Sequence, residues 1–379
     1  MILLGLMKSA AAAVLIAYLT FTNGIADFID AHLLHTPTET TAPQAETELR
    51  PLGEGLAERA IPRVLLDHLE YQRAAALASK ETEPPAAVPE GESLTDAVEK
   101  SLVNIFCQYK TDRFIRTTTG SGFFINRKGV IITNAHVAQF LVLEDAKNLT
   151  GNVECVIRTG DPAEPRYTAE LLYISPAWIF DNADLITEEA PRGTGERDYA
   201  LLYVSKSVDG TPLPTSFPAI PVDTALLTRS VAGSDAVTGG YPAEKLFKEG
   251  VDAKLEPVIA STTIGTLYTF GSNYADIFSV SDSPVGEQGA SGGPVASLKS
   301  DDVIGLIVTK GDEETEGEHS LRAITLSYVD RTMKEETGFS LIDNMQGDLA
   351  ARGAVFKKAM LPFLADILSS ELNTTTRRD

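Results

Sequence analysis

Short apolar segments separated by turn residues fill this chain from Leu94 onward, and they limit the fold more than any other feature of the sequence. Turns rich in Gly, Pro, Asp and Asn, such as NRKG at 126–129, bound these segments. Many short strands without alternating helices predict an all-β fold built of barrels or sandwiches. The predicted strands are the end of LTDAVEKSLVNIFCQYK (94–110), 114–126, 129–134, 153–159, 167–175 and 199–204, then 217–222, 231–239, 257–270, 276–281, 302–309 and 321–327. They form two groups of about six, which favours a duplicated barrel.

The rest of the chain differs in composition from the strand-rich part. Residues 36–60 and 80–93 are rich in Pro, Glu, Thr and Ala, which is typical of extended linkers, and a short helix is predicted between them. Helices are also predicted at 331–337 and 346–372, where Pro362 should kink or shorten the second. We therefore divide the chain into an N-terminal apolar segment (1–30), a linker with a short helix (31–93), the strand-rich domain (94–335) and a C-terminal helical tail (336–379).

The N-terminal segment carries no charge over the 18 residues from Ser9 to Ala26. This length is at the lower edge of a membrane span and equally suits a signal peptide. We favour an uncleaved anchor, because the apolar character runs to about Ile29, past the usual apolar core of a signal peptide. With Lys8 kept on the cytoplasmic side, the rest of the chain is expected in the periplasm or at the cell surface, or secreted if the segment is cleaved.

Charge and cysteine content exclude some classes of function. The chain has 53 acidic and 32 basic residues and a formal net charge of −21, which disfavours nucleic acid as a partner. Its two cysteines, Cys107 and Cys155, lie in no CxxC or Cys/His cluster, so we expect no metal site and no cofactor. A single disulfide is open to them in an oxidising compartment.

Three stretches point to chemistry. His136 follows an apolar strand in IITNAHVA (131–138), Asp198 enters another in ERDYALLYV (196–204), and Ser291 lies in the glycine-rich turn of GEQGASGGPVA (286–296), which a strand follows. Taken singly, His136 reads equally well as a structural histidine at a strand end, and Asp198 reads better as an ordinary acid at a strand start. Together the three stand in the order His, Asp, Ser, separated by 62 and 93 residues, which is the chymotrypsin order and not that of subtilisins or α/β-hydrolases.

Here the sequence resembles the trypsin-like (chymotrypsin-fold) serine proteases, and within them the HtrA/Deg-like bacterial branch. The resemblance covers about 94–332 and is carried by AVEKSLVNI, TGSGFFINRKGVIITNAHV, DYALLYV and GASGGPV. It implies two six-stranded antiparallel β-barrels and a serine endopeptidase acting on exported or misfolded polypeptides. Only 47 residues follow Thr332, so we expect no peptide-binding PDZ module.

The resemblance also implies roles for individual residues. Ser291 would be the nucleophile, His136 its base and Asp198 the acid that orients the imidazole. The backbone N–H groups of Gly289 and Ser291 would form the oxyanion hole. A further set would shape the substrate pocket beside the nucleophile: Val285, Leu306, Ile307 and Val308. With valine at 285, where trypsin has a carboxylate, small or medium apolar P1 residues are expected.

Some points depart from the family or stay open. Tyr199 stands where the family has Ile or Leu, and Asp184 in ADLI lies at the more usual separation of 48 from His136. We prefer Asp198, because DYALLYV continues as a buried strand whereas Asp184 leads into a loop. By resemblance Cys107 and Cys155 fall on neighbouring strands, where a disulfide and two free thiols both fit. A catalytically silent scaffold and a structural envelope protein are the alternative functions, and the complete set of catalytic positions favours an active peptidase.

Overall fold

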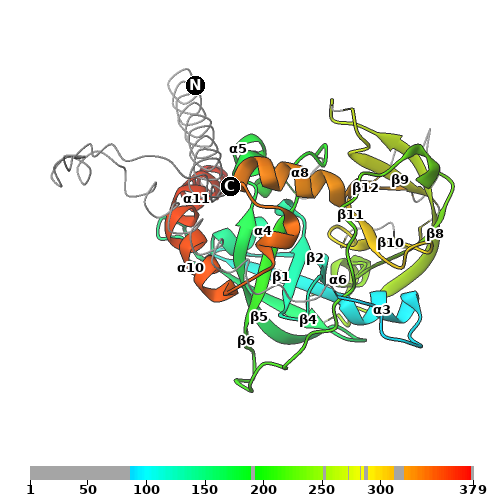
Figure 1. The fold of residues 1–379 in the computed structure, drawn as a ribbon. Coiled ribbons are helices and arrows are strands. Elements are labelled where there is room, and N and C mark those ends of the chain that lie inside the picture. The colour runs from blue at the N-terminus through cyan, green and yellow to red at the C-terminus, as the bar shows by residue number, and fades with distance from the viewer. Residues whose placement is uncertain are drawn as a thin grey trace, which may run out of the picture.

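The strand-rich part of the chain closes into two six-stranded antiparallel barrels (Figure 1). The structure is a computed structural model. It describes residues 86–188, 193–250, 253–271, 273–281, 283–285, 289–310 and 320–376. The predicted all-β architecture of two six-stranded barrels is therefore confirmed.

The first barrel has the strand order β1-β2-β3-β6-β5-β4. Its strands are β1 (Leu102–Lys110), β2 (Ile115–Phe124), β3 (Val130–Thr133), β4 (Asn152–Thr159), β5 (Glu164–Ile174) and β6 (Ala200–Ser207). All four residues of β3 and the first five of β6 are buried, because the barrel interior lies on one side of them and helices or the second barrel lie on the other. Strand β3, which leads to the candidate site, and the start of strand β6, which follows Asp198, are therefore buried on both faces.

The second barrel has the order β10-β11-β12-β9-β8-β7. Its strands are β7 (Asp235–Gly240), β8 (Val258–Tyr268), β9 (Ile277–Ser281), β10 (Pro294–Ser297), β11 (Val303–Lys310) and β12 (Leu321–Thr325). The strand predicted at 217–222 is wrong. That segment makes only an isolated bridge from Val222 to Val303, and its place in the barrel belongs to β10, the strand that follows the serine turn.

The apolar pattern of 217–222 has another cause. Phe217 and Ile220 are buried against the first barrel, where the Phe217 ring lies 5.0 Å from that of Phe124. The backbone N–H of Ile220 donates to the carbonyl of Phe124. The segment is thus an extended connection packed on the first barrel, and burial without strand pairing produces the same sequence pattern as a strand.

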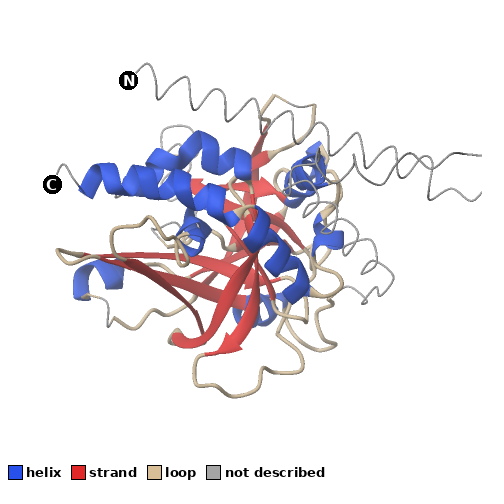
Figure 2. Cartoon of the chain, turned by 90° about the vertical axis from the view of Figure 1, so that its left-hand side faces the viewer, coloured by secondary structure: helices blue, strands red, loops and turns tan. Residues whose placement is uncertain are grey.

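Helices cover the outside of the barrels (Figure 2). They are α3 (Leu94–Ser101), α4 (Ala135–Val142), α5 (Pro176–Asn182), η2 (Ala183–Thr187), η3 (Arg229–Val231), α6 (Glu244–Glu249), α8 (Leu326–Thr337), α9 (Leu341–Asn344), α10 (Leu349–Ala359) and α11 (Leu361–Thr376). The break between α10 and α11 at Met360 lies where Pro362 was expected to interrupt a longer helix. The boundary placed at 335/336 from the sequence falls inside α8.

The C-terminal helices α10 and α11 pack on the first barrel. A Cβ at Gly353 in α10 would lie 2.6 Å from the Tyr203 ring, so a glycine is needed there for the helix to approach β6 this closely. The predicted apolar anchor at 1–30 and the predicted helix at 61–79 lie outside the described residues. Within the described ranges, none of the helices has both the length and the apolar character needed to cross a membrane.

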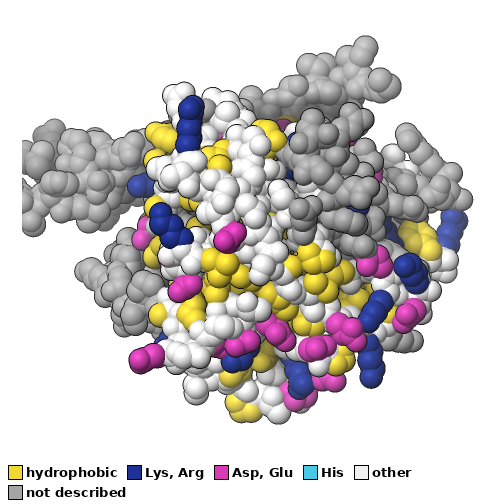
Figure 3. Space-filling model, turned by 90° about the vertical axis from the view of Figure 1, so that its right-hand side faces the viewer, with side chains coloured by type: hydrophobic (Ala, Val, Ile, Leu, Met, Phe, Trp, Pro, Cys, Tyr) yellow, Lys and Arg dark blue, Asp and Glu magenta, His cyan; other side chains and the backbone are white. Residues whose placement is uncertain are grey.

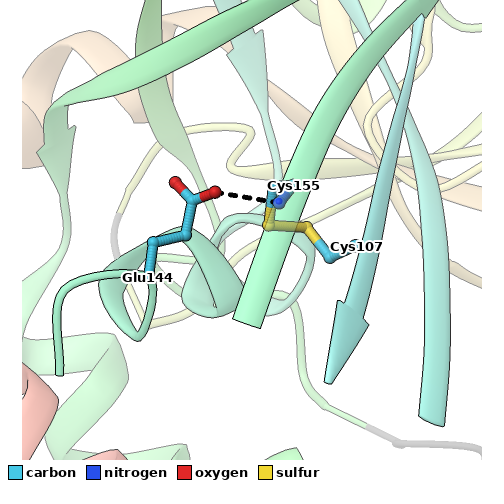
Figure 4. The surroundings of a disulfide bond; sticks show 3 residues. All are labelled: Cys107, Glu144 and Cys155. Atoms are coloured by element: carbon cyan, nitrogen blue, oxygen red, sulfur yellow. Dashed lines mark hydrogen bonds between the residues drawn. A yellow bond between two sulfur atoms is a disulfide. The ribbon is translucent and has the colours of Figure 1, made fainter. Parts of the chain in front are cut away.

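Cys107 and Cys155 form a disulfide between β1 and β4 (Figure 4). The two residues face each other directly in the register of the strand pair, with their Cα atoms 4.1 Å apart. Beside the bond, the Glu144 carboxylate accepts a hydrogen bond of 2.8 Å from the backbone N–H of Cys155. Of the two states that the sequence leaves open, the structure has the disulfide.

The face of the molecule shown in Figure 3 carries acidic side chains interspersed with Lys and Arg around a band of apolar atoms. Exposed apolar side chains of the second barrel and its approach include Leu226, Tyr274 and Leu298, each 48% exposed. Charges of both signs thus surround small apolar areas on this face.

Candidate active site

His136 is the second residue of α4, which begins as soon as β3 ends. The Asp198 carboxylate binds it twice. Oδ2 lies 2.7 Å from the imidazole Nδ1, and Oδ1 accepts a 2.9 Å bond from the backbone N–H of His136. Because a carboxylate only accepts hydrogen bonds, Nδ1 carries the ring hydrogen and Nε2 holds the free lone pair. The arrangement can therefore take up a proton at Nε2.

Asp198 is 4% exposed and lies just before β6. The side chain of Asn134, the residue that precedes α4, donates a 2.9 Å bond to the Asp198 carbonyl instead of capping the helix. Strand β6 pairs with β3 from Ala200 opposite Thr133, so the sheet itself places Asp198 beside the start of α4. The other candidate acid, Asp184, is exposed on η2, and within the described residues no hydrogen bond joins it to His136.

Ser291 lies in a turn whose shape requires glycines. Gly292 has φ +88°, and a Cβ there would lie 2.0 Å from the Ser121 carbonyl oxygen and 2.6 Å from Thr133 Oγ1. Gly289 has φ +99°, and a Cβ there would lie 2.5 Å from the Tyr241 carbonyl oxygen. Both glycines are thus needed for the turn to lie against its neighbours.

The contacts of this turn place it across the junction of the two barrels. The Ser121 N–H of β2 donates a 2.7 Å bond to the Ser291 carbonyl, and Gly292 packs against Thr133, three residues before His136. Ser291 is half-buried, and the His136 side chain is 19% exposed. In the described part of the chain no hydrogen bond joins the Ser291 hydroxyl to the imidazole; in enzymes without substrate this bond is often long.

Ser121 is a residue of the site that the motif analysis did not single out. Its hydroxyl donates a 2.6 Å bond to the Gly289 carbonyl and accepts a 2.8 Å bond from the Tyr241 N–H. Its own carbonyl accepts a 2.7 Å bond from Thr133 Oγ1. Ser121 is fully buried, and a serine in a strand of buried residues was the available signal. It fixes the carbonyl of Gly289, the residue whose N–H was expected to be an oxyanion-hole donor.

The four residues expected at the substrate pocket beside the serine turn are all buried. Strand β11 runs beside the turn, because the Gly292 N–H donates to the Ile307 carbonyl at 2.8 Å and the Ile307 N–H donates to the Gly293 carbonyl at 2.9 Å. Val308 packs next to Gly195, which lies shortly before Asp198. A Cβ placed on Gly195 would lie 2.8 Å from the Val308 side chain. A Cβ placed on Gly240 would lie 3.0 Å from the Val285 side chain and 3.1 Å from the Cα of Ala290 in the turn. Leu306 is 0% exposed.

No group of three His, Cys, Asp or Glu side chains with metal-binding geometry occurs in the described ranges. The His136 imidazole is hydrogen-bonded to the Asp198 carboxylate, and the serine turn contributes a hydroxyl and backbone amides. These groups suit acid–base and nucleophilic chemistry.

A family model and a solved structure are similar to this chain. Residues 120–306 match the family model of the trypsin-like peptidase domain. Among solved structures, the active form of the Rv3671c protease from M. tuberculosis matches with a TM-score of 0.40 and 19% sequence identity, over 69% of this chain and 95% of that chain. No curated protein sequence matches. The two closed barrels and the family match together show that the chain contains a domain of the trypsin-like peptidase family.

Proposed function

We propose that the chain is a serine endopeptidase with Ser291 as nucleophile, His136 as general base and Asp198 as the orienting acid. The observation that supports this most is the double hydrogen bond from His136 to Asp198, which sets the tautomer that a base for serine needs. The resemblance of GASGGPV to the family's nucleophile turn supports the choice of Ser291.

In the proposed reaction the Ser291 oxygen forms a bond to the carbonyl carbon of the substrate while its proton moves to His136 Nε2. The carbonyl electron pair moves onto the oxygen, which the N–H groups of Gly289 and Ser291 stabilise. Collapse of this intermediate breaks the C–N bond, and His136 returns the proton to the leaving amine. Water then repeats the sequence on the acyl-enzyme, releasing the acid and regenerating Ser291. Asp198 stabilises the imidazolium in both halves.

Hydrolysis of casein by the full chain tests this proposal. We expect the wild-type chain to cleave casein, and the Ser291→Ala and His136→Ala variants to lose this activity while keeping the wild-type circular dichroism spectrum. Cleavage by Ser291→Ala at the wild-type rate would show the assignment to be wrong.

For specificity we propose small or medium apolar P1 residues, because Val285 offers no negative charge behind the serine turn. Fluorogenic peptides with Val, Ala or Leu at P1 should be cleaved faster than matched Arg peptides. A strong preference for Arg would contradict the role of Val285.

We also propose that the substrates are exported polypeptides and that residues 1–30 attach the chain to a membrane, with its domain outside the cytoplasm. The disulfide supports this location, since such bonds persist in oxidising compartments. Protease accessibility of the domain tests this location, first in intact cells and then after the outer envelope alone has been opened. A domain that stays protected until the inner membrane is lysed would be cytoplasmic, which would contradict the proposal.

A further inference from the structure

Helix α8 connects the second barrel with the part of the first that carries Asp198. It starts directly after β12, where the Thr325 hydroxyl accepts a bond from the Tyr328 N–H. Arg331 on this helix forms an ion pair with the fully buried Asp276 of the second barrel. In Figure 1 the helix crosses from β12 toward α5, which follows β5 of the first barrel. The helix is therefore held by the second barrel and reaches the first.

Near the C-terminal end of α8 lies a buried carboxylate that the proposed mechanism does not use. The side chain of Glu336 is 5% exposed. Its Oε1 accepts hydrogen bonds from the Arg197 guanidinium and, at 3.1 Å, from the Ser175 hydroxyl, and its Oε2 accepts one from the Tyr173 hydroxyl. Burial raises the pKa of Glu336, and the Arg197 guanidinium opposes this shift. The three donors thus compensate a carboxylate that would be costly to bury alone.

Arg197 immediately precedes Asp198 and has an unusual backbone. Its φ of +55° is in the left-handed region, which a residue with a Cβ occupies only when its surroundings impose it. The surroundings here are on α8: Glu336 binds the guanidinium, and the Tyr328 hydroxyl accepts a 3.1 Å bond from the Arg197 N–H. The conformation of the residue that leads into Asp198 is therefore set from α8.

Tyr199, on the other side of Asp198, is bound to the same helix. Its hydroxyl lies 2.8 Å from Thr332 Oγ1, whose own hydrogen goes to the Tyr328 carbonyl at 2.9 Å, so Tyr199 is the donor. Burial raises the pKa of Tyr199 well above its ordinary value, which keeps this donor protonated. The Tyr199 ring stacks on that of Tyr173 with centroids 5.9 Å apart. This explains why a tyrosine stands where the family has Ile or Leu.

We propose that Glu336 is a positioning residue for the reaction proposed above: through Arg197 it holds the Asp198 carboxylate in its bidentate contact with His136. The inference rests on the proposed function. A purely stabilising role would be served as well by apolar packing, whereas a buried ion pair fixes one specific geometry. The effect on catalysis should be on turnover and not on substrate binding, because the hydrogen bonds of Glu336 go to Tyr173, Ser175 and Arg197, which lie outside the serine turn and β11.

The test uses the full chain and compares Glu336→Gln with Glu335→Gln. Glu335 is the matched control, because it also pairs with Arg197, at 3.2 Å, and loses the same charge, but its side chain is 61% exposed. Two measurements are made: kcat and KM on a fluorogenic peptide, and the NMR chemical shift of the His136 Nδ1 hydrogen without substrate, with His136→Gln assigning its signal among the five histidines.

For Glu336→Gln we expect kcat to fall about 10- to 100-fold with KM within about 2-fold of wild type. The NMR signal of the His136 Nδ1 hydrogen should move upfield, since a displaced Asp198 carboxylate accepts a longer and weaker hydrogen bond from it. For Glu335→Gln both kcat and this signal should stay near wild type. The proposal is overturned if Glu336→Gln matches Glu335→Gln in kcat and in the position of the Nδ1 hydrogen signal.

If Glu336→Gln does not fold, Tyr173→Phe and Ser175→Ala replace it, since each removes one hydroxyl that donates to the Glu336 carboxylate. A smaller fall in kcat with an upfield move of the His136 Nδ1 hydrogen signal supports the proposal, and no change in either variant overturns it.

The two proposals can also be told apart. If the wild-type chain hydrolyses no peptide but Glu336→Gln still moves the His136 Nδ1 hydrogen signal, the proposed function fails while the positioning of Asp198 by Glu336 stands.

Discussion

At the scale of single residues, Asp198 and Asp184 illustrate how sequence context selects the acid that is proposed to orient His136. Both are a plausible distance from His136 in the chain, and the separation of 48 residues favours Asp184. The strand DYALLYV after Asp198 decides between them, because β6 pairs with β3 and brings Asp198 to the histidine. This choice could be made from the sequence alone.

We predict that Asp198→Asn lowers kcat by orders of magnitude, about 10⁴-fold by analogy with the family template, since an amide donor at this position favours the wrong imidazole tautomer. Asp184→Asn is the control and should keep wild-type kcat, because Asp184 is exposed on η2. Steady-state kinetics on one peptide measures both. A loss confined to Asp184→Asn would contradict the assignment.

Ser121 could not be assigned a role from the sequence, because the groups that it binds, on Gly289, Ser291 and Tyr241, are brought to it only by the docking of the two barrels. Ser121→Ala leaves the Gly289 carbonyl and the Tyr241 N–H without this partner. We expect a loss of about 1–3 kcal/mol in the free energy of unfolding. We also expect kcat to fall by about 10- to 100-fold, because Gly289, whose N–H is the expected oxyanion-hole donor, is then no longer held through its carbonyl.

Ser101→Ala is the matched control, since Ser101 is also fully buried but, among the described residues, its hydroxyl binds only the Val98 carbonyl in its own helix. It should change the unfolding free energy in urea without changing kcat. Equal kcat for Ser121→Ala and the wild-type chain would show that Ser121 does not support the oxyanion hole.

At the scale of elements, the strands that line a barrel interior were the easiest to predict, and the connection at 217–222 was the hardest. Its buried Phe217 and Ile220 have the spacing of a strand, and only the pairing partner distinguishes the two cases. Pairing is also what decides the state of the cysteines: they are 48 residues apart in sequence, and the β1–β4 register brings them face to face.

The disulfide gives a prediction at this scale. A bond that closes a loop of this length should stabilise the domain by about 2–4 kcal/mol relative to the chain without it. Urea unfolding of the Cys107→Ser/Cys155→Ser double variant should show this loss, and a reductant should lower the stability of the wild-type chain but not of the variant. An unchanged unfolding midpoint in the double variant would contradict the prediction.

At the scale of the whole molecule, two barrels share one site, and two sets of contacts hold them in register. Ser121 joins the serine turn of the second barrel to β2 of the first. Helix α8 joins Asp276 of the second barrel to Arg197 beside Asp198. The duplicated barrel and the three catalytic candidates were predictable because each has a local pattern. The α8 network was not, because Glu336 and Arg197 are 139 residues apart and Glu336 lies in no motif.

The central claim is that this shared site makes Ser291 a nucleophile, and covalent labelling of the full chain by a fluorophosphonate tests it most directly. Mass spectrometry of the digested chain should find one adduct, on the peptide that contains Ser291. His136→Ala should prevent labelling although Ser291 is present, because the hydroxyl then has no base. An unlabelled wild-type chain, or equal labelling of the wild-type and Ser291→Ala chains, would contradict the account.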